Sequence, residues 1–577
     1  MKDIKLRFDF NDEGFNPIQF TNPKEVYVAN QIDEVIPLME KVQKAVRSGD
    51  YVAGYLSYEA APAFNKDLKT HVSPNMPIAW FACFSEKQPV QTISNKPYKL
   101  TDWQETTSYE DYESAIQSIK QAIRIGDTYQ VNYTTRLLSL FKGSKESFYH
   151  DLTDHQQANY SAYLNIGDYQ ILSASPELFF KVNKGKIETK PMKGTHKRGR
   201  TLEEDQRFKH FLTQSAKERA ENLMIVDLLR NDIGKIAEVN SVHVPEMLTV
   251  ETYPTVHQMT STVRASLKRD TNVIDWFRAL FPCGSITGAP KIKTMDYIKS
   301  LETTPRDVYC GAIGYITPDE DAIFNVPIRT VVIDDQSNRA TYGVGGGITW
   351  DSQSENEYEE TKVKARLLTE RNPRFSLLES MLLENGDFPF YHQHLNRLKI
   401  SAEYFQYKAP QKSIEHVLTI LSRTYPVGRF KVRVQSNKDG QITVNLEKAD
   451  SIKESPVSYL AKRPIDSNDP FLYHKTTHRQ VYWDVMVRKS DNFSTLLYNE
   501  REELTEFTIG NVVLEIDGVY YTPPTTSGLL AGVYREKLIY QGVIKEHVLT
   551  LNDLNKAASI WFINGVRGWV KLKEVKN

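Results

Sequence analysis

The sequence predicts two unequal domains that each mix β-strands with α-helices. The chain has 577 residues, more than a single hydrophobic core usually serves, so either three or four domains or two large ones are expected. Strand-like runs alternate with segments of helical periodicity along the chain. A short polar stretch with a proline at 369–374 (TERNPR) has the composition of a linker. We therefore predict domains at 1–370 and 371–577.

The first domain is predicted to alternate strands with helices. Strands are expected where aromatic and β-branched residues cluster between turn residues; these segments are 51–58, 170–175, 177–182, 186–192 and 324–333. Residues 183–185 (NKG) are expected to form a hairpin turn. Helices are expected where apolar residues recur every three or four positions; these segments are 109–125, 208–229 and 355–368. Segment 341–348 carries three consecutive glycines, which indicate close backbone approach to a neighbour.

The second domain begins with a comparable pattern. Residues 375–383 have strand composition and 392–405 have helical spacing. Between them, residues 384–387 (ENGD) contain Asn-Gly, which is typical of a tight turn. This domain too is therefore expected to mix strands with helices.

Composition excludes several classes of protein. Apolar residues make up 40%, charged residues 25% and aromatic residues 11%, as in globular proteins rather than disordered chains. Lys plus Arg (72) balance Asp plus Glu (73), so no basic excess indicates nucleic acid or an anionic membrane as a partner. Three cysteines are too few for a disulfide framework, and neither a long uncharged apolar run nor an apolar signal-peptide core is present. We expect a reduced, cytoplasmic protein of enzyme size.

Two pairs of glutamates stand three residues apart on predicted helices. Glu218 and Glu221 lie in one helix, and Glu357 and Glu360 lie in another, so each pair shares one helix face. Two such faces could hold Mg²⁺, which takes one or two protein carboxylates and keeps water or substrate oxygens as its other ligands. The alternative is that both pairs are solvated.

Lys193, Glu177 and Arg329 are further candidates for chemistry. Lys193 precedes a glycine just after a strand, where a desolvated lysine could act as a nucleophile or base; the alternative is a surface lysine. Glu177 begins a strand and could either donate a proton in a partly closed site or face water. Arg329 lies inside an apolar predicted strand, where it is either paired internally or faces an anionic ligand.

A series of motifs runs through the first domain in a fixed order. The motifs are 54–60 (GYLSYEA), 126–132 (GDTYQVN), 173–179 (SASPELF), 191–195 (PMKGT), 220–227 (AENLMIVD), 230–232 (RND), 281–291 (FPCGSITGAPK), 309–315 (YCGAIGY) and 345–360. In this order they resemble the chorismate-utilising enzymes, the group that contains anthranilate synthase, aminodeoxychorismate synthase and isochorismate synthase. Each motif is weak alone, but the ordered set is specific.

Position 193 distinguishes members of this family. Aminodeoxychorismate synthases look like Pro-Ile-Lys-Gly-Thr here, whereas anthranilate synthases usually have alanine in place of the lysine. The resemblance implies that Lys193 attacks C2 of chorismate as the 4-hydroxyl leaves, and that ammonia then attacks C4 and expels the lysine. Glu177 would protonate the departing hydroxyl. Gln130 stands where water-activating members place a lysine base, which argues against isochorismate-type chemistry.

The resemblance also implies how the substrate is bound. Mg²⁺ would lie between Glu221 and Glu360, with Glu218 and Glu357 reaching it through water, and would hold the ring carboxylate of chorismate. The enolpyruvyl side and the other anionic groups would be bound by Arg329, Tyr309, Thr195, Lys364 and the amides of Gly345 and Gly346. None of the three cysteines lies in a Gly-x-Cys-x-Gly motif, so free ammonia or a separate glutamine amidotransferase subunit must supply the nitrogen.

The second domain contains a lysine, a glutamate and glycine-flanked segments that could serve pyridoxal phosphate. They lie in 474–479 (HKTTHR), 504–511 (LTEFTIGN), 521–524 (YTPP), 528–535 (GLLAGVYR) and 564–568 (NGVRG). A lysine can attach this cofactor, a carboxylate can pair with its pyridinium nitrogen, and backbone amides can hold its phosphate. Taken singly, each residue could equally be a surface or capping residue.

In this order the set resembles the fold-type IV pyridoxal phosphate enzymes, among them aminodeoxychorismate lyase, branched-chain aminotransferase and D-amino acid aminotransferase. Lys475 matches the cofactor lysine, with Arg479 at the lyase-like Lys-x-x-x-Arg spacing, and Glu506 matches the pyridinium partner. Arg397 matches the phosphate arginine. The phosphate-binding backbone segments match Thr508, Ile509, Val533 and Tyr534. Tyr534 replaces the usual threonine, so only its amide is expected at the phosphate, and the usual Tyr-Gly-Asp-Gly opening is missing.

Together the two resemblances imply an α+β fold. A large domain of two antiparallel sheets with flanking helices would precede a two-part α+β domain of the pyridoxal phosphate type. A lyase would act on aminodeoxychorismate, with Lys475 abstracting the C4 proton, and would release pyruvate to leave 4-aminobenzoate, a folate precursor. One chain would then catalyse two consecutive steps. Enzymes of fold type IV are commonly dimers, which is compatible with a homodimer through the second domain.

Three alternatives stay open at this point. The second domain could be an aminotransferase or could lack a cofactor. The first domain could be anthranilate synthase component I, although Lys193 argues against it. The chain could also be a regulatory module that binds chorismate or tryptophan without catalysis. The intact set Glu177, Lys193, Glu221, Arg329 and Glu360 argues against that alternative.

Overall fold

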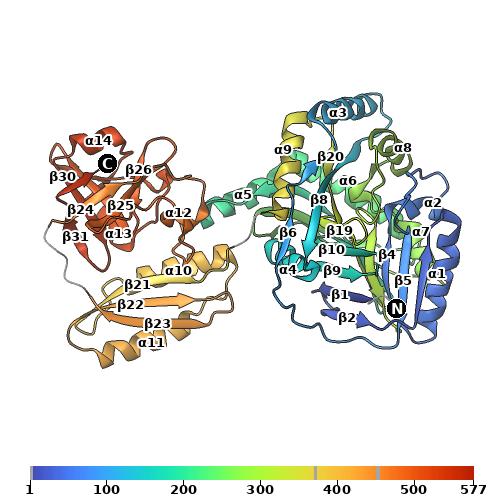
Figure 1. Cartoon of the computed structure of the whole chain (residues 1–577), viewed down its shortest axis with the longest axis horizontal. Coiled ribbons are helices and arrows are strands. Elements are labelled where there is room, and N and C mark those ends of the chain that lie inside the picture. The colour runs from blue at the N-terminus through green and yellow to red at the C-terminus, as the bar shows by residue number, and fades with distance from the viewer. Residues whose placement is uncertain (1–3, 370–372, 450–454, 577) are drawn as a thin grey trace. The chain divides into compact units, whose positions relative to one another are not determined.

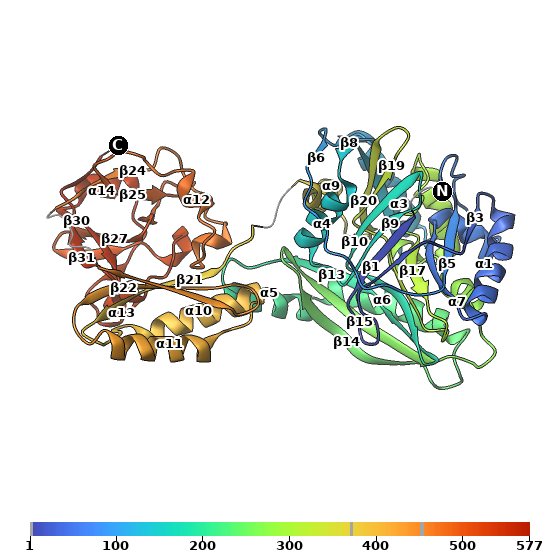
Figure 2. The ribbon, with the colours of Figure 1, turned by 60° about the horizontal axis from the view of Figure 1, so that its bottom comes forward.

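The computed structural model describes residues 4–369, 373–449 and 455–576 (Figures 1 and 2). The chain forms two compact units. The first comprises Met1–Lys197 and Lys209–Asn372, and the second comprises Arg198–Phe208 and Pro373–Asn577. The linker predicted at 369–374 falls partly on residues 370–372, which lie outside the described residues.

The first unit contains two large sheets whose strand pairings are antiparallel, as the resemblance implied. One sheet runs in the order β16 (Gly288–Ala289), β8 (Gln130–Gly143), β20 (Arg339–Ile348), β19 (Thr330–Asp334), β10 (Tyr169–Ser175), β9 (Tyr160–Asn165), β1 (Lys5–Phe10) and β2 (Ile18–Thr21). The other runs in the order β13 (Met192–Lys197), β15 (Val256–Ser266), β12 (Lys186–Lys190), β11 (Leu178–Asn183), β18 (Ala322–Asn325), β17 (Ala312–Ile316), β4 (Tyr51–Leu56), β5 (Ala79–Phe84) and β3 (Glu25–Ala29). Three further strands pair at their sides: β6 (Tyr98–Leu100) and β7 (Gln104–Glu105) with β8, and β14 (His243–Thr252) with β15.

Helices flank the two sheets of the first unit (Figure 1). They are α1 (Ile32–Arg47), α2 (Ala61–Phe64), α3 (Tyr109–Arg124), α4 (Lys145–Gln156), α6 (Ala216–Gly234), α7 (Val273–Leu280), α8 (Lys291–Leu301) and α9 (Ser354–Ala365). Helix α5 (Leu202–Gln214) begins in the segment that belongs to the second unit. Helices α6 and α9 carry the two glutamate pairs, so their placement decides the geometry of the first site.

The two sheets of the first unit pack face to face through aromatic residues. In β1 (KLRFDF) the apolar residues are fully buried and the polar residues between them are partly exposed, the pattern of a half-buried strand. Tyr315 of β17 lies with its ring centroid 5.2 Å from that of Phe8 and 6.0 Å from that of Phe10. Because β1 and β17 belong to different sheets, this cluster joins the sheets.

Most of the elements predicted for the first domain are confirmed. The predicted segments 51–58, 109–125, 170–175, 177–182 and 186–192 correspond to β4, α3, β10, β11 and β12, and 341–348 lies within β20. The turn at 183–185 has positive φ at Lys184 (51°) and Gly185 (72°), which suits a tight hairpin. The helix predicted over 355–368 corresponds to α9 followed by one short 3-10 turn, Arg366–Leu368.

Two predicted elements are wrong. The single helix expected over 208–229 is two helices, α5 and α6, because Ser215 caps the second one by accepting a hydrogen bond from Glu218 N. The single strand expected over 324–333 is two strands, β18 and β19, in different sheets. Pro327 cannot donate to a strand ladder, and Arg329 has a φ of 53°, so the chain leaves one sheet and enters the other between them.

The second unit has two sheets of its own. Strands β21 (Leu377–Glu384), β22 (Arg429–Ser436) and β23 (Ile442–Lys448) form an antiparallel sheet, and α10 (Tyr391–Phe405) and α11 (Gln411–Thr424) share its core. The larger sheet, partly parallel, runs in the order β29 (Lys545–Glu546), β28 (Val519–Thr522), β27 (Gly510–Ile516), β26 (Leu504–Phe507), β25 (Asn492–Tyr498), β24 (Val457–Leu460) and β32 (Glu574–Lys576). Strand β30 (Ser559–Asn564) pairs with β27, and β31 (Gly568–Lys571) pairs with β30. Its helices are α12 (Gln480–Trp483), α13 (Val533–Tyr540) and α14 (Leu551–Lys556). Among the described residues, no helix is long and apolar enough to cross a membrane.

Candidate active sites

Lys193 lies in a bulge at the edge of the second sheet of the first unit. β13 pairs with β15, and the register shifts between Met192 and Thr195, so Lys193 and Gly194 form the irregular part of the strand. Gly194 has a φ of 100°, and a Cβ there would lie 3.1 Å from Glu218 Oε2. A bulge of this kind redirects a side chain. The glycine also lets α6 approach the strand closely.

Helix α6 holds Lys193 by its backbone and by its side chain. Asn222 Nδ2 donates a hydrogen bond to the carbonyl oxygen of Lys193 at 3.2 Å. The Nζ atom of Lys193 lies 3.3 Å from Glu221 Oε2, and the two side chains are 15% and 16% exposed. The amine is therefore positioned inside the unit, and it must leave this ion pair before it can act as a nucleophile.

Gln130 and Gly347 complete the surroundings of the Lys193 amine. Gln130 is the first residue of β8 and is fully buried, and neither polar atom of its side chain has a partner among the described residues. A Cβ on Gly347 would lie 2.5 Å from Lys193 Nζ and 2.6 Å from Gln130 Nε2. The amine and the amide thus face the same point of β20, one from each sheet. Buried amides are rarely left unpaired, so a ligand is expected to supply these hydrogen bonds.

The glycine-rich end of β20 lies beside the second glutamate pair. Lys364 Nζ donates to Gly345 O at 2.8 Å and pairs with Glu360 Oε1 at 2.8 Å. The position of a Cβ on Gly346 lies 3.5 Å from Glu357 Oε2 and 3.6 Å from Lys364 Nζ. Only the first four residues of β20 pair with β19, so beyond them the amides that alternate away from β8 are open to a ligand.

Charges within the two glutamate pairs of α6 and α9 act on the pKa values of Glu218 and Glu357. Burial and the charge of Glu221 raise the pKa of Glu218, and burial and the charge of Glu360 raise the pKa of Glu357. Lys364 holds the pKa of Glu360 below its usual value. In the described residues, no group of three or more His, Cys, Asp or Glu side chains could hold a metal ion. The set fits an ion such as Mg²⁺, which needs only one or two protein carboxylates.

Glu177 is buried where the chain passes from β10 of one sheet to β11 of the other. Burial raises the pKa of Glu177 to about 7, and Ser285 Oγ donates a hydrogen bond to its Oε1 at 2.5 Å. A carboxyl group with such a pKa can donate a proton near neutral pH. Sequence reasoning missed Ser285, because its contact with Glu177 joins residues 108 positions apart.

Arg329 lies at a second crossing between the sheets, between β18 and β19. Its carbonyl accepts a hydrogen bond from Ala174 N at 3.1 Å, which places it beside the crossing that carries Glu177. The charges of Arg329 and Glu177 both act on the pKa of the Tyr253 hydroxyl, so the three groups lie near one another. No ion pair in the described part of the chain involves the Arg329 guanidinium, whose pKa is lowered by burial. A partly buried guanidinium without an ion pair suits an anionic ligand.

Tyr309 and Thr195 lie at the margins of this arrangement. Tyr309 is buried against Gly343 of β20, and the Arg136 guanidinium lies 5.3 Å from its ring centroid. With Arg136 and Thr341, Tyr309 lines a cavity of about 100 Å³. Thr195 is exposed on β13, and its hydroxyl donates to Gln258 Oε1 at 3.1 Å.

Lys475 is partly buried in the second unit. Its carbonyl accepts a hydrogen bond from Leu378 N at 2.9 Å, which fixes the backbone against β21. Burial, and after it the charge of Arg397, lowers the pKa of Lys475 to about 8. A lysine of this kind is partly neutral near pH 8 and can react with an aldehyde.

Glu506 is a buried carboxyl group with three hydrogen-bond donors. Tyr482 OH donates to Oε1 at 2.8 Å and Leu530 N donates to it at 3.3 Å, while Asn511 Nδ2 donates to Oε2 at 3.4 Å. Burial raises the pKa of Glu506 to about 7. Such a group can share a proton with a ring nitrogen, as the proposed pyridinium partner must.

Arg397 is held by a buried glutamate that the sequence analysis did not single out. Its Nε and Nη2 atoms donate to Glu379 at 2.8 and 2.7 Å, and His394 Nδ1 lies 2.7 Å from the same carboxylate. Although burial opposes it, Arg397 lowers the pKa of Glu379 to about 2. Arg397 Nη1 also donates to Ala531 O at 3.0 Å. Glu379 and the Ala531 carbonyl therefore together fix the orientation of the guanidinium.

The predicted phosphate segments form a small cradle around the start of α13. A Cβ on Gly565 would lie 3.3 Å from Val533 Cγ2 and 3.7 Å from His394 Nε2, and this buried nitrogen has no partner among the described residues. Helix α13 begins at Val533, so its first amides are free to bind an anion. The cradle and the unpaired nitrogen both fit a bound phosphate group.

The other predicted phosphate residues lie around this cradle. Thr508 is buried, with its hydroxyl 3.0 Å from Ser494 Oγ and its carbonyl accepting from Arg479. Ile509 is 45% exposed. The Tyr534 ring packs against Phe390, with 5.6 Å between centroids. These positions agree with the expectation that Tyr534 offers its amide rather than a short hydroxyl.

The first unit thus combines two antiparallel sheets, a buried acid, glutamate pairs on two helices, and an arginine that has no ion pair within the described residues. These are the features expected of a chorismate-utilising enzyme. Residues 11–370 match the chorismate binding enzymes, and the chain belongs to that family. Residues 376–575 match the class IV aminotransferases. Both resemblances drawn from the sequence are thereby confirmed.

Individual relatives match about half of the chain. Aminodeoxychorismate synthase component 1 of Escherichia coli (strain K12) is 39% identical over 295 residues, which is 51% of this chain and 63% of that protein. Anthranilate synthase component 1 of Aquifex aeolicus is 38% identical over 276 residues, 48% of this chain and 56% of that protein. These matches cover less than two thirds of either relative. The crystal structure of anthranilate synthase component I from Streptococcus pneumoniae has a TM-score of 0.52 at 26% identity, covering 64% of this chain and 91% of that chain.

Proposed function

We propose that the chain converts chorismate and ammonia into 4-amino-4-deoxychorismate and then eliminates pyruvate to give 4-aminobenzoate. The observation that carries the first step is the Lys193 amine, which lies at the meeting point of the two sheets with Gln130 and Glu221 around it. The second step is supported by the partly buried Lys475 and the buried Glu506. The pKa of the lysine is lowered to about 8, and the pKa of the glutamate is raised to about 7. Perturbed titrating groups of this kind cluster at catalytic sites.

In the first step, Lys193 forms a bond to C2 of chorismate while the bond from C4 to its hydroxyl breaks. Glu177 donates the proton with which that hydroxyl leaves as water, because its raised pKa keeps a protonated fraction near neutral pH. Ammonia then bonds to C4 and Lys193 departs from C2. Arg329, which has no carboxylate partner among the described residues, binds the enolpyruvyl carboxylate.

Magnesium ion completes the proposed first site. Glu221 and Glu360 would hold it, Glu218 and Glu357 would support it through water, and it would neutralise the ring carboxylate of chorismate. This assignment is supported by the mutual influence of the four carboxyl groups. A cation among them relieves the repulsion that raises the pKa values of Glu218 and Glu357.

In the second step, pyridoxal phosphate would supply an electron sink when bound. Lys475 would attach the cofactor and would take the proton from C4 of the substrate. Glu506 holds the proton of the pyridine nitrogen, and Tyr482 keeps the Glu506 carboxylate oriented by a hydrogen bond of 2.8 Å. Arg397 and the amides of Thr508, Ile509, Val533 and Tyr534 bind the phosphate.

Two partners follow from this proposal. A separate glutamine amidotransferase subunit supplies ammonia to the first site, as the name "component 1" of the relatives implies for those proteins. A homodimer through the second unit is the second expectation, from the fold-type IV resemblance. Glutamine should therefore support the reaction only when such a subunit is added, whereas an ammonium salt should support it directly.

The test is product analysis after mixing the full chain with chorismate, Mg²⁺, an ammonium salt and pyridoxal phosphate. Formation of 4-aminobenzoate and pyruvate supports both steps. Accumulation of aminodeoxychorismate would show that the second unit is not a lyase, and anthranilate would show that the first unit is an anthranilate synthase. Lys193→Ala should abolish most aminodeoxychorismate formation yet retain chorismate binding, whereas Lys186→Ala, an exposed lysine at the start of β12, should retain the parent's rate.

A further inference from the structure

A segment from the middle of the chorismate-binding sequence belongs to the second unit. Residues 198–208 group with Pro373–Asn577 by their contacts. In the sequence this segment follows β13, which carries Lys193, and precedes α6, which carries Glu218 and Glu221. It is therefore joined at both ends to elements of the first site while it packs within the unit that holds Lys475.

A buried ion pair gives the segment its shape. Arg198 Nε donates to both carboxylate oxygens of Asp205, at 2.8 and 3.0 Å, and the side chains are 9% and 1% exposed. Gly199 N donates to the same carboxylate at 2.8 Å. Charge-assisted hydrogen bonds in a buried setting fix geometry strongly. The pair closes residues 198–205 into a rigid loop.

This loop is bonded to Tyr404 at the end of α10. Arg198 Nη2 donates to Tyr404 O at 2.7 Å, and its guanidinium lies 4.4 Å from the Tyr404 ring centroid. In return, Tyr404 OH donates to Gly199 O at 2.7 Å. The Tyr404 ring also stacks on His474, with 4.2 Å between centroids and 25° between planes. His474 immediately precedes Lys475, so the loop, Tyr404 and His474 form a continuous stack that ends at the cofactor lysine.

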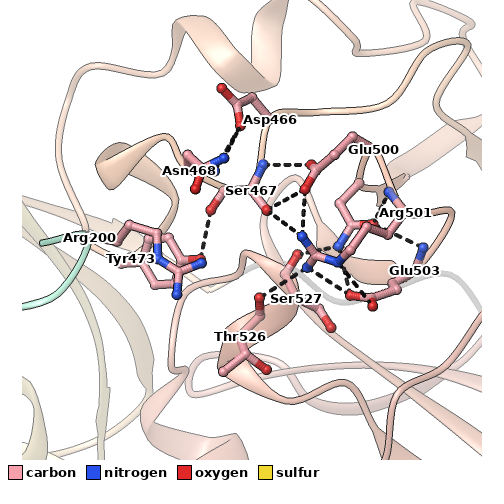
Figure 3. Close-up of polar contacts among 11 residues, drawn as sticks. Arg200, Asp466, Ser467, Asn468, Tyr473, Glu500, Arg501, Glu503, Thr526 and Ser527 are labelled. Atoms are coloured by element: carbon pink, nitrogen blue, oxygen red, sulfur yellow. Dashed lines mark hydrogen bonds and ion pairs between the residues drawn. The ribbon is translucent and has the colours of Figure 1, made fainter. Parts of the chain in front are cut away.

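Arg200 makes a second connection to the same stretch (Figure 3). Its Nη1 atom donates to Tyr473 OH at 3.1 Å, and Tyr473 OH donates to Ser467 O at 2.8 Å. Ser467 in turn donates to Glu500 at 2.6 Å. Arg501, next in sequence, donates to Thr526 O at 3.2 Å. Thr526 lies a few residues before Leu530, whose amide contacts Glu506.

We propose that residues 198–205 are a positioning segment of the second catalytic site, which hold His474 and Tyr473, and thereby Lys475, in the orientation needed to attach pyridoxal phosphate. This inference rests on the proposed function of the second unit and goes beyond it, because it assigns part of that site to a segment outside the class IV aminotransferase match at 376–575. None of the residues 198–205 is assigned a contact with substrate or cofactor.

The experiment uses the full chain and three substitutions. Asp205→Asn removes the charge that holds Arg198, and Arg198→Lys keeps a positive charge but loses the two-pronged pairing and the flat stacking surface. Arg207→Gln, an exposed arginine of the same segment, is the matched control. Each protein is mixed with pyridoxal phosphate, and the visible absorption band of the lysine-bound cofactor is followed over time. Attachment joins the aldehyde carbon to Nζ of Lys475 with loss of one water.

The rate of attachment at saturating cofactor separates positioning from simple destabilisation. For Asp205→Asn and Arg198→Lys we expect this rate to fall at least about tenfold, since misplacement of a reacting group costs rate even when binding persists. The cofactor concentration at half-saturation should change little, because Arg397 and the amides of α13 are untouched. Ammonium-dependent consumption of chorismate should stay within about twofold of the parent's, as for a surface substitution.

Two outcomes would overturn the proposal. If both variants attach the cofactor at the rate of Arg207→Gln, the segment does not position Lys475. If the parent chain itself never forms the absorption band, the proposed function of the second unit fails and the positioning role fails with it. Where Asp205→Asn does not fold, Tyr404→Phe serves instead: it removes only the hydrogen bond to Gly199 and keeps the stacked ring, and a rate equal to the control's would again contradict the proposal.

Discussion

Single residues in both sites owe their proposed chemistry to burial. A carboxyl group removed from water is harder to ionise and a lysine is easier to neutralise. Glu177 and Glu506 are accordingly shifted up to about 7, and Lys475 is shifted down to about 8. Each group is thus brought towards the pH at which it can exchange a proton efficiently.

The hydrogen bond from Ser285 tunes the acid of the first step. Because Ser285 donates to the Glu177 carboxylate, it favours the ionised form, and Ser285→Ala should raise the pKa of Glu177 above about 7 by about one unit. The step needs the protonated acid, so its rate falls as pH rises through this pKa. In Ser285→Ala the descending limb of the pH–rate profile for aminodeoxychorismate formation should therefore move to higher pH.

The control for this prediction is Glu177→Gln, which cannot donate the proton. It should lose about 100-fold to 10,000-fold in the same rate and leave no descending limb attributable to this group. A Ser285→Ala profile that coincides with the parent's, or that moves to lower pH, would contradict the role given to Glu177.

At this scale the sequence indicated the side chains that are proposed to react but not the residues that hold them. Lys193, Glu177, Lys475 and Glu506 stand in short motifs and were predicted. No local pattern identified their supporting partners, because these come from other elements of the chain. The partners are Ser285, Asn222, Tyr253, Tyr482 and Glu379. Glu379 stands in an apolar run, where its pairing with Arg397 could be recognised only once β21 and α10 were packed together.

Among the elements, two strands of the first unit matter most: the bulged β13 and the regular, glycine-rich β20. β13 places Lys193 in a bulge, and β20 presents glycines where the two sheets meet. A regular β13 would turn alternate side chains to opposite faces, and side chains on β20 would fill the space that the Lys193 amine and the Gln130 amide share. The bulge in β13 and the glycines of β20 therefore both serve the site: the bulge redirects Lys193, and the glycines leave room for its amine.

Gly347→Ala tests this element directly. The added Cβ would lie 2.5 Å from Lys193 Nζ and 2.6 Å from Gln130 Nε2, so both side chains must move. They are ends of flexible side chains, so stability should change little, whereas aminodeoxychorismate formation should fall about 100-fold because the amine is displaced by about 1 Å. Melting temperature and steady-state rate are the two measurements.

The matched control is Gly49→Ala, at a turn where no atom lies within 4 Å of the new Cβ. Its φ of 92° disfavours alanine, so it should lose some stability while keeping the parent's rate. If Gly347→Ala loses stability and rate together, the glycine serves strand packing rather than the amine.

The two wrong element predictions share a cause. Residues 208–229 and 324–333 were each predicted from one continuous pattern, and the two residues that interrupt them, Ser215 and Pro327, were given too little weight. Ser215 divides the first by capping α6, and the second divides because β18 and β19 pair with strands far away in sequence. Periodicity reports which face is buried. It does not report the sheet to which a strand belongs.

At the scale of the whole molecule, the two steps should be separable by substitution. Lys475→Ala should consume chorismate at the parent's rate with ammonium and should accumulate aminodeoxychorismate, because Lys193 is intact. Lys193→Ala, supplied with aminodeoxychorismate, should release pyruvate at the parent's rate. Chromatography of the chorismate-derived products and an enzymatic pyruvate assay follow the two half-reactions.

A mixture of the two variants extends this test. If the intermediate diffuses freely, the mixture should form 4-aminobenzoate from chorismate, whereas neither variant does so alone. Lys475→Ala that fails to consume chorismate would contradict the assignment of the two reactions to separate units.

The loop closed by Arg198 and Asp205 has a consequence for how such a chain could arise or be divided. A gene cut at the apparent linker would give one product that carries an orphaned piece of the other's scaffold, and a partner with an uncovered Tyr404 and His474. Gene fusion and gene fission would then have different requirements. Joining two independent enzymes end to end needs only a linker. Separating them again would require the second unit to evolve a replacement for residues 198–208, which now belong to it.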